Sequence, residues 1–135
     1  MINIIYGAKG TGKTKMIIDR ANASIEKHVG DIAFLADTTR YIHDIKYQIR
    51  LTNTKDSKIE SSDGLIGFVQ GMIEANYDIR NIYIDGVLRM TNKSLNELAG
   101  FFERLESISN KSDTNFTLTI SASAEELPEF LRKYI

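Results

Sequence analysis

Short apolar runs alternate with longer amphipathic stretches along the whole chain. A short apolar run bounded by polar residues or glycine is typical of a buried strand, because both of its faces are covered. Stretches with apolar residues three and four positions apart are typical of helices that pack one face against a sheet. The pattern predicts strands at residues 2–6, 32–36, 81–85 and 115–120, with a further short strand at 58–60.

The amphipathic stretches between these runs predict helices. Threonine or aspartate at the start of a helix accepts a backbone N–H bond, so Thr38 or Thr39 and Asp63 are predicted caps. The polar stretch at residues 53–58 reads as a loop. We expect helices over residues 13–27, from the threonines to about 50, over 64–77, over 94–109 and, as a short closing element, over 128–134.

Strands that alternate with helices predict a single α/β domain over residues 1–135. In such a domain the strands run parallel and helices cover both faces of the sheet. We therefore expect three layers built on a sheet of about four or five strands. Ligands of these sheets bind at the carboxyl ends of the strands, so the residues that follow each strand are the candidates for chemistry.

The composition excludes several classes of function. The 135 residues include 17 basic and 18 acidic side chains, and the net charge of -1 gives no strong nucleic-acid signal. The chain has no cysteine, which excludes disulfides, thiolate chemistry and cysteine metal sites. No apolar run is long enough to span a membrane, and a strand-like run at the N-terminus leaves no room for a signal peptide. We therefore expect a cytoplasmic protein.

Residues 7–14, GAKGTGKT, match G-x-x-x-x-G-K-[ST] at every fixed position. A strand-like run precedes them and a helix-compatible stretch follows, which is the context that this phosphate-binding motif requires. Glycines let the backbone curl so that N–H groups point at phosphate oxygens, and the helix adds its positive N-terminal end. The predicted phosphate-binding residues are Gly7, Ala8, Lys9, Gly10, Thr11, Gly12, Lys13, Thr14 and Lys15, with Lys13 on the outer phosphates.

A magnesium ion beside the phosphates needs oxygen ligands from the protein. The hydroxyl of Thr14 belongs to the motif and can bind the ion directly. Asp85 ends the apolar run at residues 82–84 and would hold the ion through its water shell. The sequence therefore predicts a Mg²⁺ site formed by Thr14 and Asp85 next to a nucleoside triphosphate.

The motif at residues 7–14 and the run at 82–85 resemble the Walker A and Walker B elements of the P-loop NTPases. The resemblance covers essentially the whole chain and implies an α/β domain that binds a nucleoside triphosphate with Mg²⁺. It also implies a RecA-like strand order, in which the strand at 115–120 lies between the strand before the motif and the strand that ends at Asp85. Residues 124–135 are similar to the ending of small, largely uncharacterised bacterial ATP-binding proteins, some labelled twitching-motility ATPase-like. Motility motors carry a further domain and histidine-rich and acidic boxes that we do not find here, so we do not expect a motor.

One residue departs from the pattern of many ATPases of this kind. Gly86 follows Asp85, where such ATPases usually have a glutamate that orients the attacking water. Either hydrolysis is slow or another carboxylate acts as the base. The resemblance to RecA-like members points to Asp37, which follows the second predicted strand, and Glu60 is the next candidate. A solvated loop carboxylate is the alternative for both.

Further polar residues follow the predicted strands. By the same resemblance, Ser121 would be the sensor that contacts the γ-phosphate or the attacking water, with Ser123 as a second choice. Arg40 and Arg89 could contact phosphate or act in the site of a neighbouring molecule. Ordinary strand-end serines and surface arginines are the alternatives.

Three functions agree with these features. The first is an ATP-binding protein with slow, Mg²⁺-dependent ATP hydrolysis, in which Lys13, Asp37 and Ser121 take part in the reaction. The second is a nucleotide-gated interaction module without useful turnover, in which the segments 37–40 and 85–91 respond to the nucleotide. The third is a small-molecule kinase, although no arginine-rich lid is evident. The protein partner and the oligomeric state stay open.

Overall fold

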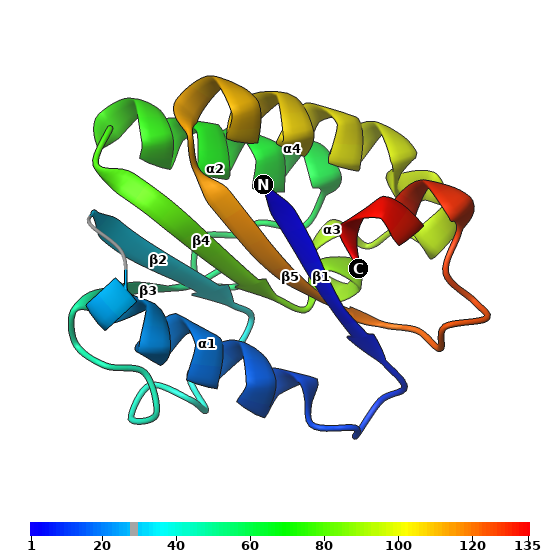
Figure 1. Cartoon of the computed structure of the whole chain (residues 1–135), viewed down its shortest axis with the longest axis horizontal. Helices are drawn as coiled ribbons and strands as arrows, with labels where there is room; N and C mark the ends of the chain where they lie inside the picture. The colour runs from blue at the N-terminus through cyan, green and yellow to red at the C-terminus, as the bar shows by residue number, and fades with distance from the viewer. Residues whose placement is uncertain (28–29) are drawn as a thin grey trace.

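The computed structural model describes residues 1–27 and 30–135. A five-stranded sheet lies at its centre, with α1 (Lys13–Lys27) on one face and α2 (Ser62–Ala75) and α4 (Ala99–Ser112) on the other (Figure 1). The expected three-layer α/β architecture is therefore confirmed. The predicted bounds of α1 are confirmed as well.

All neighbouring strands of the sheet pair in parallel, in the order β1-β5-β4-β2-β3. β5 lies between β1 and β4, which confirms the expected position of the last strand. Because every strand runs the same way, the residues that follow them meet at one edge of the sheet. The strands are β1 (Ile2–Gly7), β2 (Asp31–Ala36), β3 (Ile49–Asn53), β4 (Ile79–Asp85) and β5 (Asn115–Ser121).

Each face of the sheet has its own apolar core. Under α1, Ile17 packs with Phe34 and Tyr83, whose rings stack with their centroids 6.3 Å apart. The opposite core is larger, and it joins α2, α4 and the C-terminal 3-10 helix η2 (Glu129–Tyr134) to the sheet. Phe102 of α4 is buried in this core and stacks on Tyr134, with 5.5 Å between ring centroids. These two cores hold the carboxyl edge of the sheet in place from both sides.

The stretch at residues 38–50 is not the predicted helix. Residues 38–48 form turns, and residues 49–53 form β3 at the edge of the sheet. The side chain of Asn22 in α1 donates to the carbonyl of Asp44 at 2.8 Å and accepts from the N–H of Lys46 at 3.0 Å. Ile45 is buried beneath the turns. Contacts with α1 therefore replace the bonds that a helix would have made within this segment.

Residues 58–60 are not a strand, because β3 takes the edge of the sheet before them. Residues 54–58 form turns, as the polar composition predicts. Ser61 caps α2, since its hydroxyl oxygen accepts the N–H of Gly64 at 3.0 Å. The predicted cap, Asp63, lies inside the first turn of α2 instead.

Two further elements differ from the expectation. The helix expected over residues 94–109 begins as a 3-10 turn, η1 (Leu95–Leu98), and continues as α4 to Ser112. The residues after β4 form a one-turn helix, α3 (Val87–Thr91), which the sequence did not reveal. Among the helices of the described residues, none has the length and apolar character needed to cross a bilayer.

Candidate functional site

The glycine-rich loop, residues 7–14, leads from β1 into α1 at the carboxyl edge of the sheet. Gly12 has a φ of 87°, in the left-handed region that side chains disfavour, and the chain turns there into the helix. The N–H of Met16 donates to the carbonyl of Gly12 at 3.1 Å. The hydroxyl of Thr11 donates to the carbonyl of Ala8 at 2.7 Å, which fixes the curl of the loop. The positive N-terminal end of α1 is thus presented beside the loop.

Lys13 is folded back onto this loop. Its side chain is buried, and Nζ donates to the carbonyl of Ala8 at 3.0 Å. An ammonium group has three donors, so further N–H groups can meet an anion held by the loop. Lys15, by contrast, points along the exposed side of α1 and pairs with Asp19 at 2.9 Å. Lys9 is also exposed.

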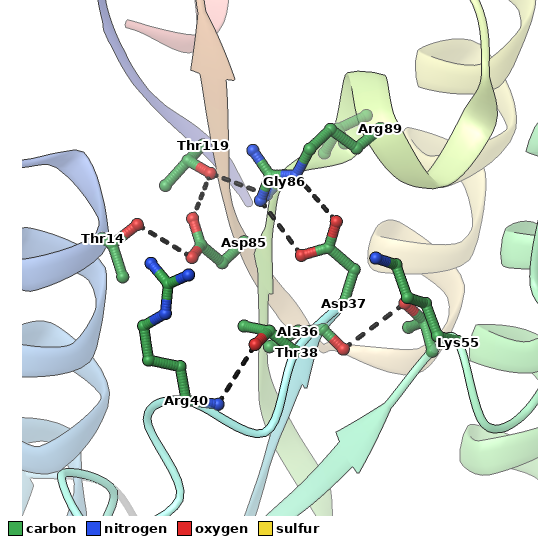
Figure 2. A network of polar contacts seen from close by, with 12 residues as sticks. Thr14, Ala36, Asp37, Thr38, Arg40, Lys55, Asp85, Gly86, Arg89 and Thr119 are labelled. Carbon is green, nitrogen blue, oxygen red and sulfur yellow. Dashed lines mark hydrogen bonds and ion pairs between the residues drawn. The ribbon is translucent and has the colours of Figure 1, made fainter. Parts of the chain in front are cut away.

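Asp85 joins the loop to the centre of the sheet. Its side chain is 4% exposed, and its Oδ2 accepts the hydroxyl of Thr14 at 3.0 Å. Its Oδ1 accepts the hydroxyl of Thr119 at 2.6 Å (Figure 2). The two predicted magnesium ligands are therefore brought together across 71 residues of sequence. A carboxylate and a hydroxyl at this separation form a suitable oxygen pair for a hard cation.

Thr119 is the site residue that the sequence analysis missed. Its hydroxyl oxygen accepts the N–H of Gly86 at 2.8 Å while the hydroxyl donates to Asp85. One hydroxyl therefore fixes both the carboxylate and the turn after β4. Thr119 lies inside β5, whereas Ser121 and Ser123 follow the predicted end of that strand. The period of two along β5, combined with the expected strand order, would have pointed to Thr119.

Ser121 lies two residues further along β5, beside Gly7 of β1. It therefore shares the sheet face of Thr119 and lies next to the start of the glycine-rich loop. Its side chain is exposed. The sensor role of Ser121 stays a prediction. The backbone N–H of Ser123 donates to the Glu126 carboxylate at 3.0 Å, and its role as the second choice also stays a prediction.

Asp37 forms a two-pronged ion pair with Arg89 of α3. Oδ2 accepts from Nε at 2.7 Å and Oδ1 accepts from Nη2 at 3.2 Å. Burial by itself raises the pKa of the Asp37 carboxyl, but the hydrogen bonds and charge of Arg89 outweigh it and hold the pKa below its ordinary value. The bonds from Asp37 raise the pKa of Arg89, and the charge of Asp85 adds to this effect. A carboxylate held in this way is a weak proton acceptor, so the predicted role of Asp37 as base stays a prediction.

Replacing Asp37 with asparagine is expected to lower the free energy of unfolding at pH 7 by about 1 kcal/mol or less, because Arg89 is half exposed. The pKa of Asp37 is depressed in the folded protein, so its stabilising contribution exists above pH 3.8 and disappears as the pH falls below that value. Urea unfolding of the wild type and of Asp37→Asn at neutral and acidic pH measures this difference in the free energy of unfolding. A difference that widened in acid would contradict the ion pair.

Glu60 shares a polar hollow with Asp37. The hollow has a volume of about 460 Å³ and lies beside α3, with Lys55 and Asn92 also on its wall. Met90 and Ile59 supply apolar surface to its lining. The second candidate base is therefore near the first, although the strand predicted for Glu60 does not exist. The hollow is large enough for several water molecules or a small ligand.

Arg40 lies three residues after Asp37. Its N–H donates to the hydroxyl oxygen of Thr38 at 3.1 Å, within the turns that follow β2. Figure 2 shows its guanidinium directed toward Thr14 and Asp85. Both arginines that the sequence singled out are therefore near the carboxyl edge. Arg40 is exposed, whereas Arg89 is held by its ion pair.

No group of three or more histidine, cysteine, aspartate or glutamate side chains gathers to hold a metal within residues 1–27 and 30–135. The pair formed by Thr14 and Asp85 suits Mg²⁺ that keeps several waters and shares phosphate oxygens with a nucleotide.

The chain matches no model of a known protein family, and no curated protein matches it.

Proposed function

We propose that this protein binds a nucleoside triphosphate, ATP, together with Mg²⁺ and hydrolyses it slowly. The observation that carries the proposal is the 3.0 Å bond between Thr14 and Asp85, which joins the end of the glycine-rich loop to the end of β4. A buried lysine on the loop and a helix N-terminus beside it add positive charge where phosphates would lie. The strand order supports an ATPase of the RecA-like kind, because β5 separates β1 from β4.

Each residue has a role in this proposal. Lys13 and the loop N–H groups hold the outer phosphates, and Thr14 and Asp85 hold Mg²⁺ directly or through water. The metal supplies charge neutralisation to the phosphates. Phosphoryl transfer depends chiefly on positioning and charge stabilisation, which these residues provide. Thr119 keeps Asp85 in the orientation that the metal site needs.

Slow turnover is expected because neither Gly86 nor Asp37 supplies a free carboxylate as a base. Gly86 has no carboxylate, and Asp37 is engaged by Arg89. The same two observations favour a second candidate, a nucleotide-gated interaction module in which binding alone has the effect. The third function, a small-molecule kinase, gains no support from the strand order. In the kinase–GTPase branch of the P-loop proteins β1 and β4 are neighbours, whereas here β5 lies between them.

Phosphate release from ATP at increasing Mg²⁺ tests the proposal. Asp85→Asn keeps the size of the side chain but removes its charge, so we expect the apparent affinity for Mg²⁺ to fall by roughly 10–100-fold. Asp78→Asn, in the exposed turn just before β4, is the matched control and should behave like the wild type. Equal magnesium dependence in all three proteins would contradict the role of Asp85. Tight binding without release by the wild type would favour the gated module.

A further inference from the structure

The guanidinium of Arg89 lies over Gly86, so a side chain at residue 86 would have to displace it. A Cβ atom at residue 86 would lie 2.6 Å from Cζ of Arg89 and would also collide with Nη2. The backbone of Gly86 has a φ of 99°, which independently disfavours a side chain. A positive charge of the same chain therefore fills the space beside residue 86, directly after Asp85.

Two contacts hold Arg89 in this place. Val87 and Met90 are buried and anchor the one-turn helix α3 against the sheet. Asp37 then grips the guanidinium through Nε and Nη2 (Figure 2). A guanidinium has five N–H donors, and these two bonds leave Nη1 without an acceptor among the described residues. The bonds from Nε and Nη2 to Asp37 thus orient the guanidinium, while the donors on Nη1 stay available to an anion.

We propose that Arg89 recognises the terminal phosphate of the bound nucleotide and that Asp37 is its positioning residue. This inference rests on the proposed function, because it needs a nucleotide on the glycine-rich loop with its metal at Thr14 and Asp85. The terminal phosphate would then lie next to Asp85, where the guanidinium is already held. ADP lacks this phosphate, so Arg89 distinguishes the triphosphate from the diphosphate and reports the state of the nucleotide to α3 and the hollow beside it.

Arg40 is the natural comparison for Arg89. Figure 2 shows it directed toward the same Asp85, but from an exposed turn. Among the described residues no ion pair joins its guanidinium to a carboxylate, and the residue is exposed. Holding a flexible arginine costs side-chain entropy that a pre-positioned one has already lost. We therefore expect Arg89, rather than Arg40, to supply the preference for the triphosphate.

The dissociation constants for Mg-ATP and Mg-ADP, measured by calorimetry on wild type, Arg89→Ala, Arg89→Lys and Arg40→Ala, test this. Arg89→Ala is expected to weaken Mg-ATP binding by roughly tenfold or more and to leave Mg-ADP binding within about twofold, because one charged contact is lost only with the triphosphate. Arg89→Lys keeps the positive charge but loses the planar guanidinium, so its affinity for Mg-ATP should lie between those of the wild type and Arg89→Ala. Arg40→Ala should keep the wild-type ratio.

Asp37→Asn separates a positioning role from a role as base. A positioning residue acts through Arg89, so the variant should lose part of its affinity for Mg-ATP while its affinity for Mg-ADP stays unchanged. A base would leave both affinities unchanged and lower only the turnover. Unchanged affinities with a lower turnover would overturn the assignment of Asp37 as a positioning residue. The measurements on the Arg89 variants would then decide whether Arg89 recognises the terminal phosphate.

Gly86→Ala gives an independent check of the contact. The strain from φ is the same whether or not Arg89 is present, so comparing the variant in wild-type and Arg89→Ala backgrounds isolates the collision with the guanidinium. We expect Gly86→Ala to lower the ATP-to-ADP preference in the wild-type background and to leave it unchanged in Arg89→Ala. An equal change in both backgrounds would overturn the placement of the charge.

The failure of this inference differs from the failure of the proposed function. If the wild type binds neither nucleotide, both are wrong. If it binds both nucleotides, loses both in Lys13→Ala and keeps its ATP-to-ADP ratio in Arg89→Ala, only the inference is overturned. A ratio that changes in Arg40→Ala instead of Arg89→Ala overturns it as well.

Discussion

Lys13→Ala is expected to weaken Mg-ATP binding by roughly a hundredfold, because it removes a charged donor from the outer phosphates. The side chain is buried against the loop that it serves, with Nζ 3.0 Å from the carbonyl of Ala8. Its loss therefore leaves the loop without its buried positive charge. Calorimetric titration with Mg-ATP measures the change, and phosphate release should disappear in the same variant.

Lys27→Ala is the matched control for Lys13. Lys27 lies in the same helix, exposed and at its other end, so the net charge changes equally while the loop is untouched. We expect wild-type affinity from it. Equal weakening in both variants would mean that the phosphates respond to overall charge, and no weakening in Lys13→Ala would remove the loop from the site.

Phe102→Ala is expected to lower the free energy of unfolding by about 3–5 kcal/mol. The ring is 1% exposed and lies in the larger core, edge to face with Phe101 at 5.3 Å between centroids and stacked on Tyr134. Alanine would leave a cavity between α4 and the C-terminal η2. Since a domain of this kind has a stability of about 5–15 kcal/mol, urea unfolding at pH 7 would show a large shift.

Tyr77→Ala is the control for this loss of an aromatic ring. Tyr77 is 71% exposed in the turn before β4, so its removal should change the free energy of unfolding by about 0.5 kcal/mol or less. A cost below about 1 kcal/mol for Phe102→Ala would contradict the packing of η2 on α4.

The sequence predicted most of the sheet because its strands are short apolar runs covered on both faces. It failed at β3, an edge strand in which only Ile49 and Leu51 are apolar. In the preceding segment, Tyr41, Ile42 and Ile45 have the three- and four-residue spacing of a helix. Contacts from Asn22 decide the conformation there, and they join residues more than twenty positions apart. A local pattern contains no information about such contacts.

In the candidate site, too, the local patterns could be predicted and the long-range contacts could not. The loop motif and the aspartate at the end of a strand are local patterns, and the fold brings Thr14 and Asp85 together as expected. Thr119 and the ion pair of Asp37 with Arg89 depend on which strands are neighbours and on α3, a one-turn helix too short to give a periodic signal. Gly86 could be read from the sequence as a missing glutamate, but the guanidinium above it could not.

The most direct test of the central claim is a calorimetric titration of the wild-type protein with ATP in the presence and absence of Mg²⁺. The proposed function predicts saturable binding of one nucleotide per chain that is stronger with Mg²⁺ and is strongly weakened in Lys13→Ala. No saturable binding, or binding that is indifferent to both Mg²⁺ and Lys13, would contradict a nucleotide site at the glycine-rich loop.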